Sequence, residues 1–160
     1  MSDPKTAPGR PSRSGSRRSK TDRAQTARRP ARLLAVISNR DDQKALKRIL
    51  QGQQWQLFFA TSCAEAIEVL TSQRIPIVMC DHDLPDGCWK DILDNSVQYR
   101  QHPTLIVSSR LADDYLWTEV LNLGGYDILS KPFDQDEVRR VIFGAWLREA
   151  NPIGARAASH

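Results

Sequence analysis

The chain has 160 residues, of which 40% are hydrophobic and 26% charged, and its net charge is +4. This length suits one domain with a single core, and no apolar stretch approaches the length of a membrane span. Cys63, Cys80 and Cys88 are an odd number without the spacing of a disulfide framework or a zinc site. Their number and spacing exclude both and favour a reduced, cytoplasmic protein.

Positive charge is concentrated at the N-terminus. Residues 1–32 hold ten Lys or Arg and two Asp, a net charge of +8, which leaves −4 for the rest of a chain whose total is +4. Residues 1–31 contain almost no large apolar side chain, so burial cannot offset the entropy cost of ordering them. The pattern predicts a disordered basic tail at 1–31, a folded domain at 32–150 and a flexible tail at 151–160.

Short apolar runs alternate with amphipathic segments through the folded part. The runs are typical of buried strands, and apolar residues at helical spacing predict helices. A capping box at Ser62–Glu65 and an acidic cap at Asp134 mark two helix starts, while Gly52 and Gly124 mark two helix ends. In chain order, we predict strands at 33–37, 55–60, 75–80, 105–107 and 126–129, and helices at 41–50, 62–70, 89–97, 115–123 and 134–145.

Five strands that alternate with five helices predict an α/β fold, a doubly wound parallel sheet with helices on both faces. Functional groups in such sheets gather beyond the carboxyl ends of the strands. The third strand is followed by three carboxylates in six residues, which predicts a site of high negative potential; they are Asp81, Asp83 and Asp86. If the sheet order is 2-1-3-4-5, Asp81 lies beside Ser108, and Lys131 reaches in from the fifth strand. Carboxylate, hydroxyl and ammonium together suit a phosphoryl group attached to Asp81.

Residues 32–148 resemble the receiver domain of two-component response regulators. Asp81 stands four residues before Pro85, as the phosphoacceptor of that family does. The segment 107–109, Val-Ser-Ser, is similar to the Ser/Thr-Ala strand end of the family. The segment 124–133, Gly-Gly-Tyr-Asp-Ile-Leu-Ser-Lys-Pro-Phe, is similar to its Ala-Gly-Ala-x-x-Tyr-Leu-x-Lys-Pro-Phe segment.

The resemblance implies a flavodoxin-like fold with sheet order 2-1-3-4-5 and a cis peptide bond between Lys131 and Pro132. It also implies a role in phosphorelay signalling, with Asp81 as phosphoacceptor and Ser108 and Lys131 in contact with the phosphate. The donor would be a sensor histidine kinase, and the output would be binding to a downstream protein. Because only about ten residues follow the last predicted helix, we expect a single-domain receiver that is not itself an enzyme and has no catalytic residues.

The sequence departs from the family at the metal site. The family has an acidic pair at the end of its first strand, where this chain has Ile37 and Ser38. Mg²⁺ requires oxygen ligands in near-octahedral geometry. Here the resemblance leaves the Asp81 carboxylate and the backbone carbonyl of Asp83 as metal ligands, with the Asp83 side chain, through water, and Asn39 as weak substitutes. We therefore expect Mg²⁺ binding to be weak or absent and phosphorylation to be slow.

Other interpretations remain open. Ile128 occupies the family's switch position, commonly aromatic, so the chain could be a pseudo-receiver that docks partners without phosphate. A more remote alternative is a haloacid-dehalogenase-like phosphohydrolase, which shares the Asp81-x-Asp83 pattern but usually has Thr or Val where Pro85 stands. His82 is interpreted as a residue of the pocket rim. The basic tail could contact nucleic acid or another polyanion nonspecifically, could be a functionless extension, or could reflect an over-extended gene start.

Overall fold

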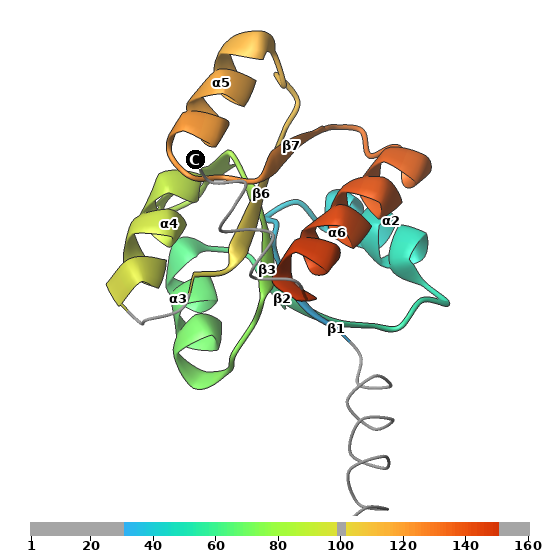
Figure 1. Cartoon of the computed structure of the whole chain (residues 1–160), viewed down its shortest axis with the longest axis horizontal. Helices are drawn as coiled ribbons and strands as arrows, with labels where there is room; N and C mark the ends of the chain where they lie inside the picture. Colours follow the sequence, from blue (N-terminus) through green and yellow to red (C-terminus); the bar gives the residue numbers. More distant parts are fainter. Residues whose placement is uncertain (1–30, 99–101, 151–160) are drawn as a thin grey trace, which may run out of the picture. The chain divides into compact units, whose positions relative to one another are not determined.

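The computed structural model describes residues 31–98 and 102–150, without the side chains of 96–98. Its main sheet has five parallel strands in the order β2-β1-β3-β6-β7 (Figure 1). The strands are β1 (Ala31–Val36), β2 (Trp55–Ala60), β3 (Ile77–Asp81), β6 (Thr104–Ser109) and β7 (Asp127–Ser130). When only the strands of this sheet are counted in chain order, β6 and β7 are the fourth and fifth, and the order is 2-1-3-4-5. The predicted doubly wound, flavodoxin-like α/β fold is therefore confirmed.

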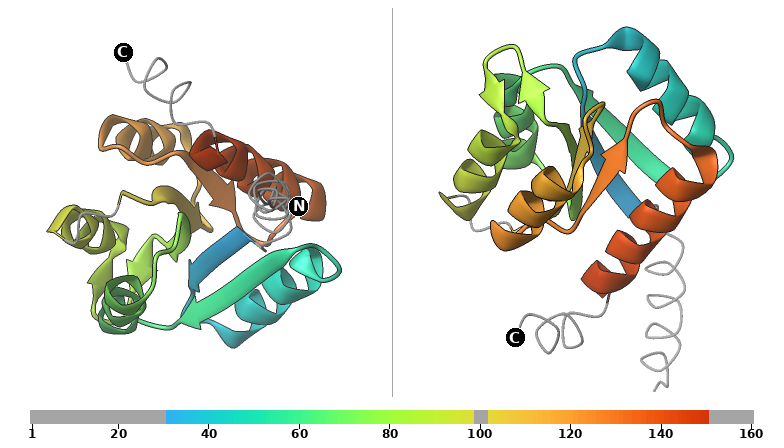
Figure 2. Two further views of the ribbon diagram at one scale, coloured as in Figure 1. Left: turned by 60° about the horizontal axis from the view of Figure 1, so that its bottom comes forward. Right: turned by 90° about the horizontal axis from the view of Figure 1, so that it is seen from above.

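Five helices cover the two faces of the sheet in the described residues (Figure 2). Their bounds are α2 (Arg40–Leu50), α3 (Cys63–Ser72), α4 (Trp89–Gln98), α5 (Asp114–Asn122) and α6 (Gln135–Ala150). Helices α3, α4 and α5 pack on one face, and α2 and α6 pack on the other. No helix in the described ranges has both the length and the apolar character needed to cross a bilayer.

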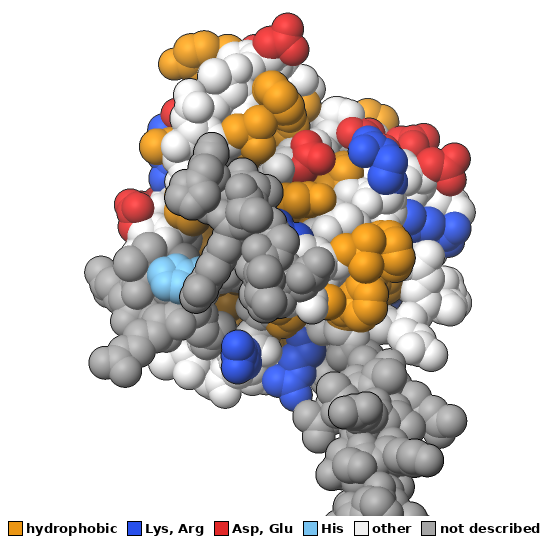
Figure 3. Space-filling model, in the orientation of Figure 1, with side chains coloured by type: hydrophobic (Ala, Val, Ile, Leu, Met, Phe, Trp, Pro, Cys, Tyr) orange, Lys and Arg blue, Asp and Glu red, His pale blue; other side chains and the backbone are white. Residues whose placement is uncertain are grey.

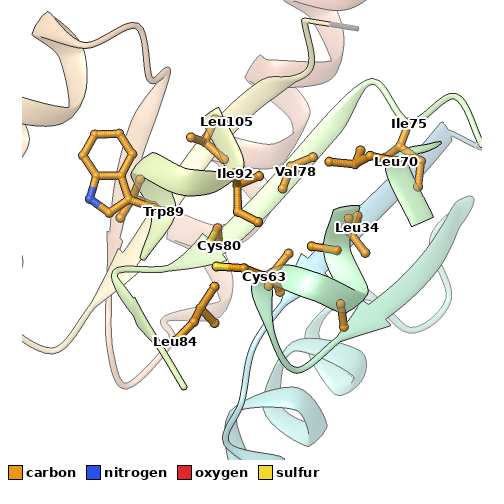
Figure 4. Close-up of a cluster of buried hydrophobic side chains, with 14 of the residues drawn as sticks. Leu34, Cys63, Leu70, Ile75, Val78, Cys80, Leu84, Trp89, Ile92 and Leu105 are labelled. Carbon is orange, nitrogen blue, oxygen red and sulfur yellow. The ribbon is translucent and has the colours of Figure 1, made fainter. Parts of the chain in front are cut away.

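Alternating residues of the strands supply two separate cores. Leu34 and Val36 of β1 join the cluster under α3–α5, in which Trp89 is fully buried (Figure 4). Leu33 and Ala35 join the cluster under α2 and α6. Burying each large apolar side chain contributes about 1.5–3 kcal/mol. The two cores therefore fix which face of the sheet each side chain at the strand ends occupies.

Hydrogen bonds and backbone angles confirm the capping residues predicted at the helix ends. Ser62 Oγ accepts the N–H of Glu65, and Asp134 Oδ2 accepts the N–H of Glu137 at the start of α6. Gly52 and Gly124 have φ values of 83° and 103°, which glycine adopts without steric cost.

Two features of the chain's boundaries and turns differ from the sequence prediction. Ala31, placed in the basic tail by its composition, begins β1 instead, and the rest of that tail and residues 151–160 lie outside the described ranges. A two-stranded hairpin of β4 (Asp83–Leu84) and β5 (Gly87–Cys88) was not predicted, because two-residue strands leave no periodic pattern. The peptide bond between Lys131 and Pro132 is cis, as predicted.

Candidate functional site

The carboxyl ends of β1, β3, β6 and β7 bring the predicted site residues together. Asp81 is the last residue of β3 and is paired in register with Ser108 of β6. On the other side, the ladder of β1 and β3 ends one residue earlier, at Val36 and Cys80, so Ile37 follows at the level of Asp81. Asp81 and Ser108 are both buried, and a buried carboxylate needs partners.

Both oxygens of the Asp81 carboxylate accept hydrogen bonds. Ser108 Oγ donates to Oδ1 over 2.9 Å, and Lys131 Nζ lies 2.6 Å from the same oxygen. The backbone N–H of Ser38 donates to Oδ2 over 3.3 Å. The predicted convergence of Asp81, Ser108 and Lys131 is thus present in the structure. Charge-assisted hydrogen bonds of this kind are stronger than neutral ones, so they hold the carboxylate in one orientation.

A fourth charged residue, Asp42 of α2, was not predicted to belong to this site. Asp42 Oδ2 lies 2.8 Å from Lys131 Nζ, and Asp42 Oδ1 lies 3.7 Å from Nη2 of Arg110. The side chains of Lys131 and Asp42 are only 8% and 13% exposed, whereas Arg110 is at the surface. One buried ammonium therefore bridges two carboxylates that come from different elements, Asp42 of α2 and Asp81 of β3.

The first turn of α2 is anchored to the end of β1, which places Asp42. Asn39 Oδ1 accepts the N–H groups of Asp41 and Asp42 and so caps the helix. Gln43 Nε2 donates to the carbonyl oxygen of Ile37 over 2.6 Å. These bonds hold the side chain of Asp42 over the end of the sheet, on the face that α2 covers.

The predicted cluster of three carboxylates is wrong, because only Asp81 of the three lies in the pocket. The Asp83 side chain is 87% exposed, and its Oδ2 lies 3.0 Å from His82 Nδ1. Asp86 instead accepts the N–H groups of Cys63 and Ala64 at the start of α3, over 2.7 and 3.0 Å. The bond from the Cys63 N–H, followed by that from Ala64, lowers the pKa of Asp86 below its usual value.

The side chains named from the sequence offer few free oxygen ligands to a Mg²⁺ ion. Both oxygens of Asp81 are engaged, Asp83 points to solvent, and Asn39 Oδ1 is used as a helix cap. Among residues 31–98 and 102–150, no group of three or more His, Cys, Asp or Glu could hold a metal ion. The pocket's described positive charge comes from Lys131, with Arg110 at its rim.

Cys63 and Cys80 do not supply a nucleophile to the site. Burial, followed by the nearby Asp86 carboxylate, raises the pKa of the Cys63 thiol to about 12. Burial also raises the pKa of Cys80 well above its ordinary value. Since the thiolate is the reactive form, both thiols are unreactive at neutral pH.

The model of the response regulator receiver domain matches residues 34–143, which is more than two thirds of the chain. No curated protein matches.

Solved structures with the same fold include several receiver domains. The signal receiver domain of a LuxO repressor protein from Vibrio parahaemolyticus is 19% identical, with a TM-score of 0.73, and the match covers 79% of this chain and 97% of that one. The signal receiver domain of an HD domain-containing protein from Pseudomonas fluorescens is 25% identical, with a TM-score of 0.70 and coverages of 77% and 99%.

A third similar structure contains a metal. The receiver domain of a sensor histidine kinase from Pseudomonas aeruginosa is 20% identical, with a TM-score of 0.61, and the match covers 70% of this chain and 93% of that one. It has a magnesium ion coordinated in its active-site cleft.

Proposed function

This chain belongs to the response regulator receiver domain family, and from that premise we propose that it receives a phosphoryl group on Asp81 from a sensor histidine kinase. The phosphorylated form would then bind a downstream protein. The family is generally a signalling module rather than a catalyst, and the meeting of Asp81, Ser108 and Lys131 at the strand ends supports a phosphoacceptor site there.

The observation that carries this proposal is the shared contact of Ser108 and Lys131 with one oxygen of Asp81. In the proposed step, an Asp81 oxygen forms a bond to phosphorus while the phosphorus–nitrogen bond to the donor histidine breaks. The histidine keeps the bonding electron pair and takes up a proton. Lys131 and Ser108 then donate to the oxygens of the transferred phosphoryl group and stabilise its charge.

Weak binding of Mg²⁺ is part of the proposal. Ile37 and Ser38 stand where the family has its acidic pair, and Ile37 is fully buried with no ligand atom in its side chain. A related receiver domain coordinates magnesium in its cleft. Without the pair, this chain offers too few oxygen ligands for tight binding. We expect it to accept phosphate more slowly than receivers that have the pair.

The face of α5, β7 and α6 supports an output through protein binding. Helices α5 and α6 expose large hydrophobic side chains that stand out over both helices in Figure 3. They include Tyr115, Trp117 and Leu121 of α5 and Phe143, Trp146 and Leu147 of α6. The rings of Phe143 and Trp146 lie 5.9 Å apart. An exposed aromatic pair accompanied by further exposed apolar side chains favours protein binding.

A phosphate-independent pseudo-receiver is the second candidate function, and one observation favours it. The Asp81 carboxylate already accepts from Ser108, Lys131 and the Ser38 N–H, so the pocket is satisfied without a phosphoryl group. Ile128, half-buried on β7, also lacks the aromatic ring commonly found at the switch position. In this alternative the face of α5, β7 and α6 would bind its partner in the unphosphorylated state.

Two further expectations accompany the proposal. A cytoplasmic location is supported by the three cysteines, all of which are unpaired thiols. Contact between the basic tail and a polyanion stays a prediction, because residues 1–30 lie outside the described ranges.

Incubation with acetyl phosphate tests the proposed phosphoacceptor. We expect the chain to gain one phosphoryl group, detected as an increase in intact mass that hydroxylamine removes. Asp81→Asn should abolish the gain, because the nucleophilic oxygen is lost. Asp83→Asn is the matched control, since its exposed carboxylate lies two residues away and outside the pocket, and it should retain the label. If the chain never gains the phosphoryl group, the proposal fails and the pseudo-receiver becomes the better account.

A further inference from the structure

We infer that Asp42 is a latch on the pocket: it holds Lys131 in the resting state and competes with an incoming phosphoryl group for that ammonium. This inference rests on the proposed function and adds a residue that regulates the site. The latch comes from the first turn of α2, four residues beyond Ser38.

The geometry of Lys131 carries the inference. Its Nζ lies 2.8 Å from Asp42 Oδ2 and 2.6 Å from Asp81 Oδ1, with all three side chains almost completely buried. A buried ammonium is stable when carboxylates compensate its charge. Here the second carboxylate is delivered by a helix, at a pocket where Ile37 and Ser38 supply no acid. The pocket can therefore keep its lysine in place without a metal ion.

The same contact opposes phosphorylation. A phosphoryl group on Asp81 needs Lys131 for its own oxygens, and it brings negative charge next to the ammonium that Asp42 already contacts. Asp42 then loses its partner and is repelled. Arg110 lies at the rim of the pocket, with its Nη2 3.7 Å from Asp42 Oδ1. The displaced Asp42 carboxylate can move toward this guanidinium.

Displacing Asp42 would pass the signal to two elements. Asp42 belongs to the first turn of α2, and Arg110 begins the loop between β6 and α5. Leu111 and Tyr115 follow Arg110 and are 80% and 79% exposed. A shift of Arg110 would therefore change the surface at the start of α5 directly, without the aromatic switch that Ile128 cannot provide.

Asp42→Asn tests the latch, with Asp41→Asn as a matched control. Both variants remove one charge from the same helical turn, but Asp41 is exposed and has no ion pair with Lys131 in the described contacts. In the full chain without any phosphodonor, the ¹⁵N signal of the Lys131 ammonium should shift or broaden in Asp42→Asn and remain unchanged in Asp41→Asn. An unchanged signal in both variants would overturn the pairing and, with it, the latch.

The second arm measures labelling by acetyl phosphate. One unit charge beside the incoming group is sufficient to change the rate about tenfold. We therefore expect Asp42→Asn to label about tenfold faster than wild type at low donor concentration, chiefly through a lower KM, and Asp41→Asn to match wild type. Label in Asp42→Asn alone would also support the latch, since it would show that Asp42 keeps the wild-type site closed.

The remaining outcomes separate the latch from the proposed function. Slower labelling of Asp42→Asn, with wild type labelled normally, would overturn the latch and make Asp42 a productive member of the site. If no variant is labelled while the Lys131 signal still responds to Asp42→Asn, the proposed phosphoacceptor fails. Competition for the phosphoryl group would fail with it, and the bridge would be a structural ion pair only.

Discussion

Replacing Ile37 and Ser38 together by Asp is expected to destabilise the domain strongly without metal and to make it dependent on Mg²⁺. Ile37 is fully buried at the level of Asp81, so the double variant loses core packing and buries a carboxylate beside that of Asp81. A loss of about 3–5 kcal/mol in the free energy of unfolding follows from these two effects. Urea titration of the metal-free protein measures this loss.

Addition of Mg²⁺ should recover much of this loss. Two new carboxylates beside Asp81 would supply the missing ligands, and a cation at about 100 times its Kd stabilises the folded state by about 2.7 kcal/mol. Labelling of Asp81 by acetyl phosphate should also become faster, because the cation offsets the charge of the incoming group.

The neutral variant Ile37→Asn, Ser38→Asn is the matched control for the added carboxylates. It loses the same packing but gains no carboxylate, so Mg²⁺ should leave its stability unchanged. If the acidic variant folds, binds Mg²⁺ and still accepts no phosphate, Ser108 and Lys131 are not poised for transfer, and the pseudo-receiver becomes the better account.

Lys131→Met is expected to have the other large effect, because it leaves Asp42 and Asp81 buried without their shared cation. Removing one partner of a buried charge pair typically costs about 3–5 kcal/mol, a large share of a domain's total stability of about 5–15 kcal/mol. Combining Lys131→Met with Asp42→Asn removes one of the two stranded carboxylates, so the double variant should be more stable than Lys131→Met alone. Urea unfolding of the four proteins of this cycle measures the coupling, which we expect to be about 1–3 kcal/mol.

Lys90→Met is the control for the loss of a lysine, because it removes a paired lysine from the surface instead of from the pocket. Lys90 pairs with Glu119 at the surface, and its hydrogen bond to that carboxylate raises the pKa of Lys90. Solvent screens such a pair, so its removal should have far less effect than removal of Lys131. Equal losses at the two lysines, or additive effects within the cycle, would show that the buried bridge contributes nothing special to stability.

The residues predicted the parallel strands and the principal site residues for a physical reason, while the sheet order came from the resemblance to receiver domains. Asp81, Ser108 and Lys131 each follow an apolar run, and the carboxyl ends of parallel strands meet at one edge of the sheet. Backbone pairing thus determines where these three residues lie, to within the length of a side chain. Strand patterns, together with the sheet order that the resemblance implied, are enough to predict such positions.

The sequence did not predict the partners of the loop carboxylates. Asp83 and Asp86 follow β3 closely enough in the sequence to reach the pocket. Asp83 nevertheless pairs with His82, and Asp86 caps α3. The path of the tight hairpin between β4 and β5 decides these directions, and two-residue strands leave no pattern from which to predict it.

The sequence contains a pattern that predicts a buried position for Asp42. With Ala45, Leu46 and Ile49 it occupies positions i, i+3, i+4 and i+7, the inward stripe of an amphipathic helix. An acid at the start of such a stripe needs a buried cation, because an unpaired charge there is costly. Lys131 was the cation already assigned to that end of the sheet, so the pair could have been inferred.

Titration with Mg²⁺ most directly tests the central claim, that Lys131, held in place by Asp42, rather than a metal ion offsets the charge of Asp81. The measurement follows the amide NMR signals of Asp81, Asp83 and Ser108 in the wild-type chain. We predict small, non-saturating shifts, because Ile37 and Ser38 supply no acidic ligands. Saturable shifts at all three residues with a Kd of about 1 mM or below, equivalent to binding by about −4 kcal/mol or stronger, would contradict the claim.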